Sequence, residues 1–202
     1  DTFISGTDIH AQTARKIFNI PTDQPVTKDQ RRAAKTVNFS IIYGISSFGL
    51  AAQLGVSRTD AQSIINSYMS GLPEIKEYIE STKKFATENA CVYTPWGRRI
   101  ELPEIKNPRM RAYATRAAIN APIQGFEADL MRRAMVEIAN NIIRPNPDKI
   151  RMIMQVHDEI VFECRAEHAN EFAQKIKHAM ETVTHLSVPL VAEYVIDTAW
   201  GK

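Results

Sequence analysis

The sequence has no hydrophobic run long enough to cross a membrane and very little cysteine. A membrane-spanning helix needs about 18 apolar residues in succession, and no stretch of the 202 residues has that character. The first residues, DTFISGTDIH, show neither the basic nor the apolar region of a secretory signal. The 2 cysteines, Cys91 and Cys164, are far apart and have no metal-binding spacing. We therefore expect reduced thiols and a cytoplasmic protein.

The sequence also lacks a large excess of charge of either sign. The net charge is +2, and the chain has 44% hydrophobic and 24% charged residues, as soluble globular proteins do. Its length suits one large domain or two small ones. Overall charge gives no indication of a polyanionic partner, although segment 97–116 is rich in Arg and Lys. From charge alone, a solvated helix face is the favoured explanation of that segment.

The hydrophobic pattern is helical up to about residue 149 and mixed after it, which predicts an α+β fold. Asp8 and Ser57 are expected to cap helices, and Thr27 or Asp29 a third. Pro122 fits the first turn of a helix better than its interior, so we expect a break there. The predicted helices cover 8–19, 27–43, 57–71, 73–90, 108–120, 122–143 and 167–184, and the predicted strands lie within 91–102 and at 150–156, 160–164 and 190–196.

On the predicted helix at 27–43, four residues at four-residue spacing form a stripe. Arg31 and Lys35 are followed by Phe39 and Tyr43, over roughly 18 Å at ~1.5 Å per residue. The cations suit phosphates and the rings suit a sugar and a base, so a nucleoside triphosphate has a matching shape. The alternative is an amphipathic helix with solvated cations and buried rings. The stripe alone favours that alternative.

An acidic pair lies between two apolar predicted strands, in QVHDEIVFE. Acids at this place are costly unless they are exposed or bind a cation, and Asp158 with Glu159 suits a hard ion such as Mg²⁺. The alternative is an ordinary exposed acidic turn. His157 alone indicates a hydrogen-bonding turn residue more than a metal ligand.

A third set combines one cation with two amides. Arg116, Asn120 and Gln124 follow each other at four-residue spacing, and amide side chains can read base edges in the DNA minor groove. Capping of a helix by Asn120 is the rival explanation, and the two do not exclude each other.

These three sets, in this order, resemble the motifs of family A DNA polymerases. RRAAKTVNFSIIYG is similar to the fingers motif R-x-x-x-K-x-x-x-F-x-x-x-Y-G, and QVHDEIVFE to the acidic palm motif. DIHAQTA and segment 115–135 also resemble family segments, and the similarity extends over essentially the whole chain. The resemblance implies part of a right-hand polymerase, with a helical fingers subdomain at 1–110 and the C-terminal, antiparallel-sheet part of the palm at 111–202.

The resemblance also implies a role for each site residue in DNA-directed DNA synthesis. Arg31 and Lys35 are expected to hold the incoming dNTP, with Phe39 against its sugar and Tyr43 stacked at the templating base pair. The residues expected to contact primer–template DNA are Arg116, Asn120, Gln124 and His157. Asp158, supported by Glu159, is expected to coordinate Mg²⁺ in a two-ion site that promotes attack of a primer 3′-hydroxyl on the α-phosphate.

One family motif is missing. A segment similar to D-Y-S-Q-I-E-L-R, which supplies a further metal-binding Asp and the gate against ribonucleotides, does not occur. We therefore expect a C-terminal fragment that lacks the thumb and is inactive alone. A palm sheet that is short of one strand exposes an edge, so dimerisation through this edge is a further hypothesis.

Two alternatives remain. The first is a non-catalytic nucleotide- or nucleic-acid-binding module, although Asp158 and Glu159 would repel a phosphate-rich ligand without a metal. The second is a single-subunit RNA polymerase, against which the fingers motif and the Arg116 set favour the DNA enzyme.

Overall fold

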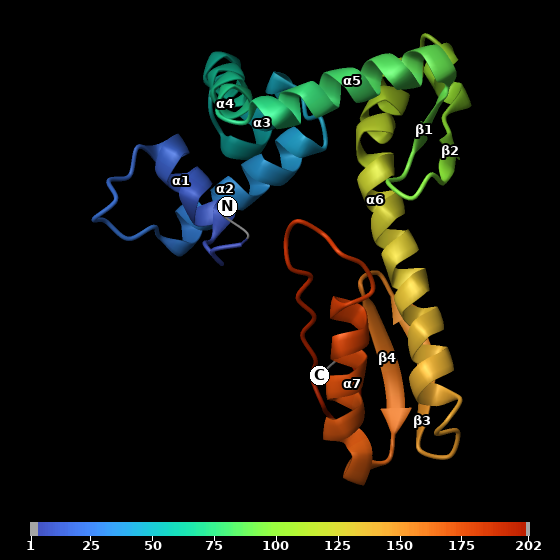
Figure 1. Ribbon diagram of the computed structural model, residues 1–202. Helices are drawn as coiled ribbons and strands as arrows, with labels where there is room; N and C mark the ends of the chain where they lie inside the picture. Colours follow the sequence, from blue (N-terminus) through green and yellow to red (C-terminus); the bar gives the residue numbers. More distant parts are fainter. Residues whose placement is uncertain (1–3, 201–202) are drawn as a thin grey trace. The chain divides into compact units, whose positions relative to one another are not determined.

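A computed structural model describes residues 4–200 (Figure 1). The chain divides into two compact units, one that ends at Gly125 and one that begins at Phe126, and each is described by itself. Helices dominate, and two small antiparallel sheets accompany them, so the predicted α+β class is confirmed. None of the helices in residues 4–200 is both long and apolar enough to cross a membrane.

The helices of the first unit begin where the sequence supplies capping side chains. Asp8 caps α1 (Ile9–Phe18), Thr27 caps α2 (Lys28–Ile42) and Ser57 caps α4 (Arg58–Ser70), as predicted. The long helix α5 (Pro73–Asn89) starts with a proline, also as predicted. Helix α3 (Ser47–Leu54), which is capped by Ser46 and ends at Gly55, was not predicted.

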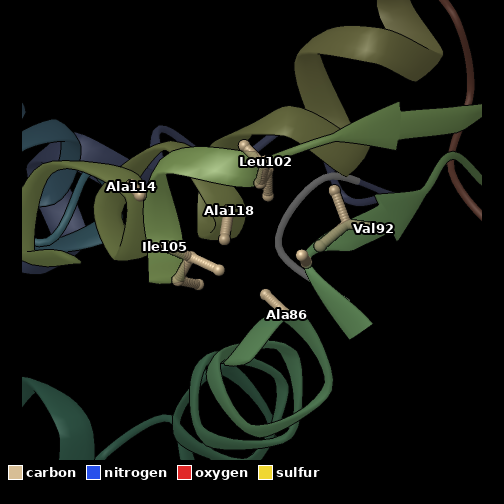
Figure 2. Packing of buried hydrophobic residues seen from close by; sticks show 7 residues of the cluster. Ala86, Val92, Leu102, Ile105, Ala114 and Ala118 are labelled. Carbon is tan, nitrogen blue, oxygen red and sulfur yellow. The ribbon is translucent and has the colours of Figure 1, made fainter. Parts of the chain in front are cut away.

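Two hydrophobic clusters hold the first unit together. One joins α2, α3 and α4 through Val37, Ile41, Leu50 and Ala61. The other joins α5, the hairpin of β1 (Cys91–Tyr93) and β2 (Arg99–Glu101), the 3₁₀ turn η1 (Pro103–Lys106) and the start of α6 (Arg111–Ile138). Figure 2 shows the second cluster, in which Val92, Leu102 and Ile105 face Ala86 and Ala118. The predicted hairpin is confirmed, and its position fixes the segment that leads into α6.

The predicted break at Pro122 is wrong, because α6 (Arg111–Ile138) is one helix with Pro122 inside it. Proline has no N–H to donate to the carbonyl four residues earlier, which normally disfavours a helix interior. Packing outweighs this cost here. Ala114 and Ala118, before the proline, are buried in the cluster of Figure 2. After it, the carbonyl of Gly125 accepts a hydrogen bond of 2.7 Å from Arg98 Nη2.

The second unit packs an antiparallel hairpin with helix α7. Its order is the end of α6, the π-helical turn η2 (Ala139–Ile143), β3 (Ile150–Val156), β4 (Glu159–Cys164), the short η3 (Ala166–His168) and α7 (Ala169–Glu181). Ile138, Ile150, Phe172 and Ile176 form its core. The hairpin predicted around residues 157–159 is confirmed. The predicted last helix is also confirmed, with shorter bounds.

The predicted strand at 190–196 is wrong. Among residues 126–200, β3 and β4 pair only with each other, so this apolar segment has no strand partner. The segment is instead bonded to the end of α7, because the N–H of Ala192 donates to Oε1 of Glu181 at 3.1 Å. Val191 and Val195 are 73% and 88% exposed. The apolar pattern of residues 190–196 therefore predicted a strand, but a strand needs a second strand to pair with, and the pattern of one segment does not identify it.

Candidate functional site

The stripe on α2 faces solvent because the opposite face of the helix is buried. Thr27 and Gln30 form a reciprocal capping box at the start of α2, with hydrogen bonds of 2.9 and 3.2 Å. Val37 and Ile41 turn into the core. Phe39 and Tyr43 are 43% and 45% exposed, although large aromatic rings gain most from burial. The alternative of buried rings is therefore wrong for this helix.

From Lys35 to Tyr43, consecutive side chains of the stripe are also in contact with one another. The rings of Phe39 and Tyr43 stack with centroids 6.1 Å apart and an angle of 19° between their planes. Lys35 Nζ lies 5.9 Å from the centroid of Phe39, within reach of a weak cation–π interaction. The stripe thus presents two cations and two flat rings in a row on one exposed face.

Helix α1 contributes Asp8, which was predicted only as a helix cap, and His10, to which the sequence analysis gave no role. The carboxylate of Asp8 caps α1 and also pairs with Arg31, 23 residues further along the chain. The hydrogen bond from Arg31 is the main reason that the pKa of the Asp8 carboxyl lies below its usual value. The first cation of the stripe is therefore already held by a carboxylate in this structure.

His10 lies against the stripe and is oriented by a buried amide. Its ring centroid is 5.8 Å from that of Phe39. Asn38 is only 4% exposed, and its Nδ2 donates to His10 Nδ1 at 2.9 Å, which leaves the proton of the neutral ring on Nε2. Burial, together with the charges of Arg31 and Lys35, lowers the pKa of His10. Burial and the two nearby cations thus disfavour the charged form of the ring.

Asn38 has a further unusual feature. Its Oδ1 is buried and accepts no hydrogen bond from any residue in 4–200. Leaving a buried acceptor unpaired costs about 1–3 kcal/mol. The signal for both residues was available in the sequence, since His10 lies in DIHAQTA and Asn38 directly precedes Phe39. Their pairing depends on the packing of α1 against α2, which the sequence pattern does not give.

Arg116, Asn120 and Gln124 lie on successive turns of α6. Asn120 is inside the helix, where its Nδ2 donates to the carbonyl of Arg116 at 3.0 Å, so the capping alternative is wrong. Arg116 and Gln124 are exposed. The end of α2 approaches this face closely, because a Cβ built on Gly44 would lie 3.3 Å from Arg116 Cγ. An open cavity of about 640 Å³ is lined by both helix segments, including Gly44, Arg116 and Ile119.

The acidic pair of the second unit lies at the tight turn between β3 and β4. His157 has a positive φ of 53°, and the side chain of Gln155 donates to its carbonyl. Asp158 and Glu159 are both exposed. Trp200 Nε1 donates to Glu159 Oε1 at 2.7 Å. Within residues 4–200, the carboxylate of Asp158 has no hydrogen bond or ion pair, whereas that of Glu159 already accepts a hydrogen bond.

These two carboxylates fit a divalent cation only in part. Both are hard oxygen donors, as Mg²⁺ requires, and Mg²⁺ commonly keeps several water ligands. Within residues 4–200, however, no three His, Cys, Asp or Glu side chains come close enough together to form a metal centre. Asp158 and Glu159 can thus supply part of the ligand shell of one ion, and further ligands have to come from elsewhere.

The structure is thus an α+β fold with an exposed stripe of cations and rings on α2 and an exposed acidic turn between β3 and β4. The chain belongs to DNA polymerase family A, whose family model matches residues 1–202. This confirms the resemblance found in the motifs.

Individual relatives agree with this assignment. The chain is 44% identical to DNA polymerase I of Pseudomonas aeruginosa and 43% identical to DNA polymerase I of Rhizobium leguminosarum. The alignments cover 100% and 99% of the chain but only 22% and 20% of these relatives, so the chain spans about a fifth of their length. A solved structure, the POL domain of Pol1 from M. smegmatis in complex with DNA primer-template and dNTP, superimposes with a TM-score of 0.84. It is 34% identical, and the match covers 94% of the chain and 33% of that domain.

Proposed function

We propose that this chain is the fingers and C-terminal palm part of a DNA-directed DNA polymerase, which extends a primer 3′-hydroxyl with deoxynucleotides. The observation that carries the proposal is the exposed stripe of α2, because it presents cations and rings in the order of a triphosphate, a sugar and a base. The relative from M. smegmatis was solved with primer-template and dNTP, which supports the same substrates. The division into fingers at 1–110 and palm at 111–202 is part of this proposal.

The stripe would bind the incoming nucleotide from phosphate to base. Arg31 offers a planar fork for phosphate oxygens, and Lys35 offers a point charge one turn later. Phe39 would pack against the sugar, and Tyr43 would stack at the templating base pair. Because Phe39 and Tyr43 are already stacked and exposed, little ordering is required when the nucleotide arrives.

The proposed DNA contacts lie on α6 and on the hairpin turn. Arg116, Asn120 and Gln124 would follow the minor groove of the primer–template, where amides and a guanidinium can bind base edges and sugars. The exposure of Arg116 and Gln124 supports this role. His157, held at the tip of the turn by its positive φ, would lie near the primer end.

Asp158 and Glu159 are the proposed catalytic carboxylates. In the reaction, the primer 3′-hydroxyl loses its proton to solvent as its oxygen forms a bond to the α-phosphorus, and the bond from that phosphorus to the pyrophosphate oxygen breaks, so that pyrophosphate leaves. Mg²⁺ bound at these oxygens, one of two ions in a complete enzyme, would supply charge stabilisation of the attacking and leaving oxygens. Asp158 would provide the direct ligand, and Glu159, fixed by Trp200, would support it.

Binding of dNTP tests the proposal. Calorimetric titration of the chain with dATP and Mg²⁺ is compared between the wild type and Lys35→Ala, with Lys84→Ala, an exposed lysine of α5, as the control. A charge-assisted contact of this kind predicts about ten-fold weaker binding for Lys35→Ala and no change for Lys84→Ala. Equal binding by all three proteins would contradict the proposed role of α2.

Two finer points belong to the same proposal. The chain alone is expected to be inactive, so incorporation of a templated nucleotide by the purified chain would refute that part. Dimerisation through an exposed edge of the palm sheet is the second point. Sedimentation that gives a monomer at all accessible concentrations would refute it. The alternative of a non-catalytic binding module predicts nucleotide binding that does not depend on Asp158.

A further inference from the structure

We infer that Asp8 is an internal competitor for the nucleotide, because its carboxylate occupies Arg31 until a triphosphate displaces it. The inference rests on the proposed function of the α2 stripe and adds a residue that sets the affinity of this site. It assigns to the N-cap of α1 a role in nucleotide affinity in addition to helix capping.

The two oxygens of Asp8 have separate tasks. Oδ1 accepts hydrogen bonds from the N–H groups of His10 and Ala11, at 2.9 and 3.2 Å, and so caps α1. Oδ2 is not used by the cap and pairs with Nε of Arg31 at 2.5 Å. Capping alone therefore does not explain the second contact. An asparagine would cap equally well, since Asn and Asp are about equally good N-caps.

The two cations of the stripe are in different states. Arg31 is paired with a carboxylate, whereas Lys35 forms no ion pair with any residue in the described part of the chain. Lys35 instead lies near the ring of Phe39. An anion that approaches the stripe can thus use Lys35 at once, but it has to separate Asp8 from Arg31 to use both.

Both partners of this ion pair are accessible from solvent, so displacement is possible without unfolding the helix. A phosphate oxygen that replaces Oδ2 exchanges one anion for another at the same guanidinium, and the separated carboxylate returns to water. The exchange costs the free energy of the original pair. Exposed ion pairs are weak, so removing the carboxylate is expected to strengthen triphosphate binding by about two- to five-fold.

The chain offers a matched control on the same helix. Asp29 pairs with Arg32 at 3.0 Å, and both are exposed, but Arg32 is not part of the stripe. Asp29→Asn therefore removes the same charge and the same kind of ion pair, within one helical turn of Arg31. General electrostatic attraction of a polyanion would respond to both substitutions, whereas displacement from Arg31 responds only to Asp8→Asn.

The test is calorimetric titration of the full chain with dATP and Mg²⁺, and separately with inorganic tripolyphosphate, at pH 8. The proteins are the wild type, Asp8→Asn, Asp29→Asn, Arg31→Ala and the double variant Asp8→Asn/Arg31→Ala. We expect two- to five-fold tighter binding for Asp8→Asn, no change for Asp29→Asn, and no gain from Asp8→Asn when Arg31 is absent. Circular dichroism and thermal melting check that α1 is intact.

Each other outcome contradicts the inference in a recognisable way. Equal or weaker binding by Asp8→Asn would mean that Asp8 does not compete or that it orients Arg31 for the ligand. The same gain in Asp29→Asn, or in the Arg31→Ala background, would show a general charge effect. If the wild type binds and only the Asp8→Asn gain is missing, this inference alone fails. If neither the wild type nor Asp8→Asn binds either ligand, the proposed function of α2 fails with it.

Discussion

Replacing Gly44 by alanine separates the cost of backbone strain from the effect of a close contact. Gly44 has a φ of 75°, and Gly55 has a φ of 67°, both in the left-handed region that costs an L-residue about 1–2 kcal/mol. A Cβ on Gly55 meets nothing within 4 Å, whereas a Cβ on Gly44 would lie 3.3 Å from Arg116 Cγ and 3.7 Å from Ile119 Cδ1. The two substitutions thus share the strain and differ in the contact.

The expected loss of stability follows from these numbers. Alanine also restricts the unfolded chain, which recovers about 0.4–1 kcal/mol. We therefore expect both variants to lose roughly 1 kcal/mol of unfolding free energy, or about 0.5 M in the urea midpoint. The arginine side chain is flexible and can shift by a few tenths of an ångström, so Gly44→Ala should lose only slightly more than Gly55→Ala. Its main effect should be on the position of Arg116.

The assay uses one fluorescent reporter in the first unit. The chain has 2 tryptophans, so a Trp200→Phe background leaves Trp96 to follow urea unfolding of the unit that contains both glycines. Fluorescence anisotropy with a labelled primer–template then measures DNA binding. We expect similar midpoints for the two variants but weaker DNA binding for Gly44→Ala alone. Gly44→Ala with wild-type stability, or equal DNA binding by both variants, would refute this reasoning.

Two further predictions concern contacts made by single side chains. Burial places the pKa of His10 below its usual value of about 6.5, so the folded chain binds fewer protons than the unfolded chain and loses stability as the pH falls through 6.5 towards the lowered value. NMR titration of His10 should show the lowered pKa, and a pKa at or above 6.5 would contradict the burial. Asp8→Asn should lower the pKa of His10 further, because the Asp8 carboxylate raises it. Tyr78 donates to the carbonyl of Ile119 at 2.8 Å, so Tyr78→Phe should cost about 0.5–1.5 kcal/mol in urea unfolding, whereas no loss would mean that water replaces the bond.

Local signals allowed most of the helices to be predicted. Asp8, Thr27 and Ser57 cap helices through hydrogen bonds to residues two or three positions ahead, so the sequence alone contains both partners. The β3–β4 hairpin has the same advantage, because its strands are separated by only two residues. The class and these elements were therefore predictable from local chemistry.

Features that depend on distant residues were not predictable in this way. The continuation of α6 through Pro122 depends on burial of Ala114 and Ala118 against α5 and β1. The strand expected at 190–196 needed a neighbouring strand to pair with, and the pattern within one segment does not show whether such a strand exists.

The candidate site shows the same limit. The order of cations and rings on α2 and the family motif can both be read directly from the sequence. The pairs Asp8–Arg31 and His10–Asn38 join residues 23 and 28 positions apart, and they exist only because α1 packs on α2. The motif thus identified the residues proposed to bind the nucleotide, whereas the structure added Asp8 and His10, which contact these residues.

The central claim, that the exposed face of α2 is a nucleotide site, is tested most directly by NMR mapping. The isotopically labelled chain is titrated with dATP and Mg²⁺, and backbone and side-chain shifts are followed. We expect the largest changes on Arg31, Lys35, Phe39 and Tyr43 and on the neighbouring Asp8 and His10. Changes centred on another part of the chain, or no changes at saturating nucleotide, would contradict it.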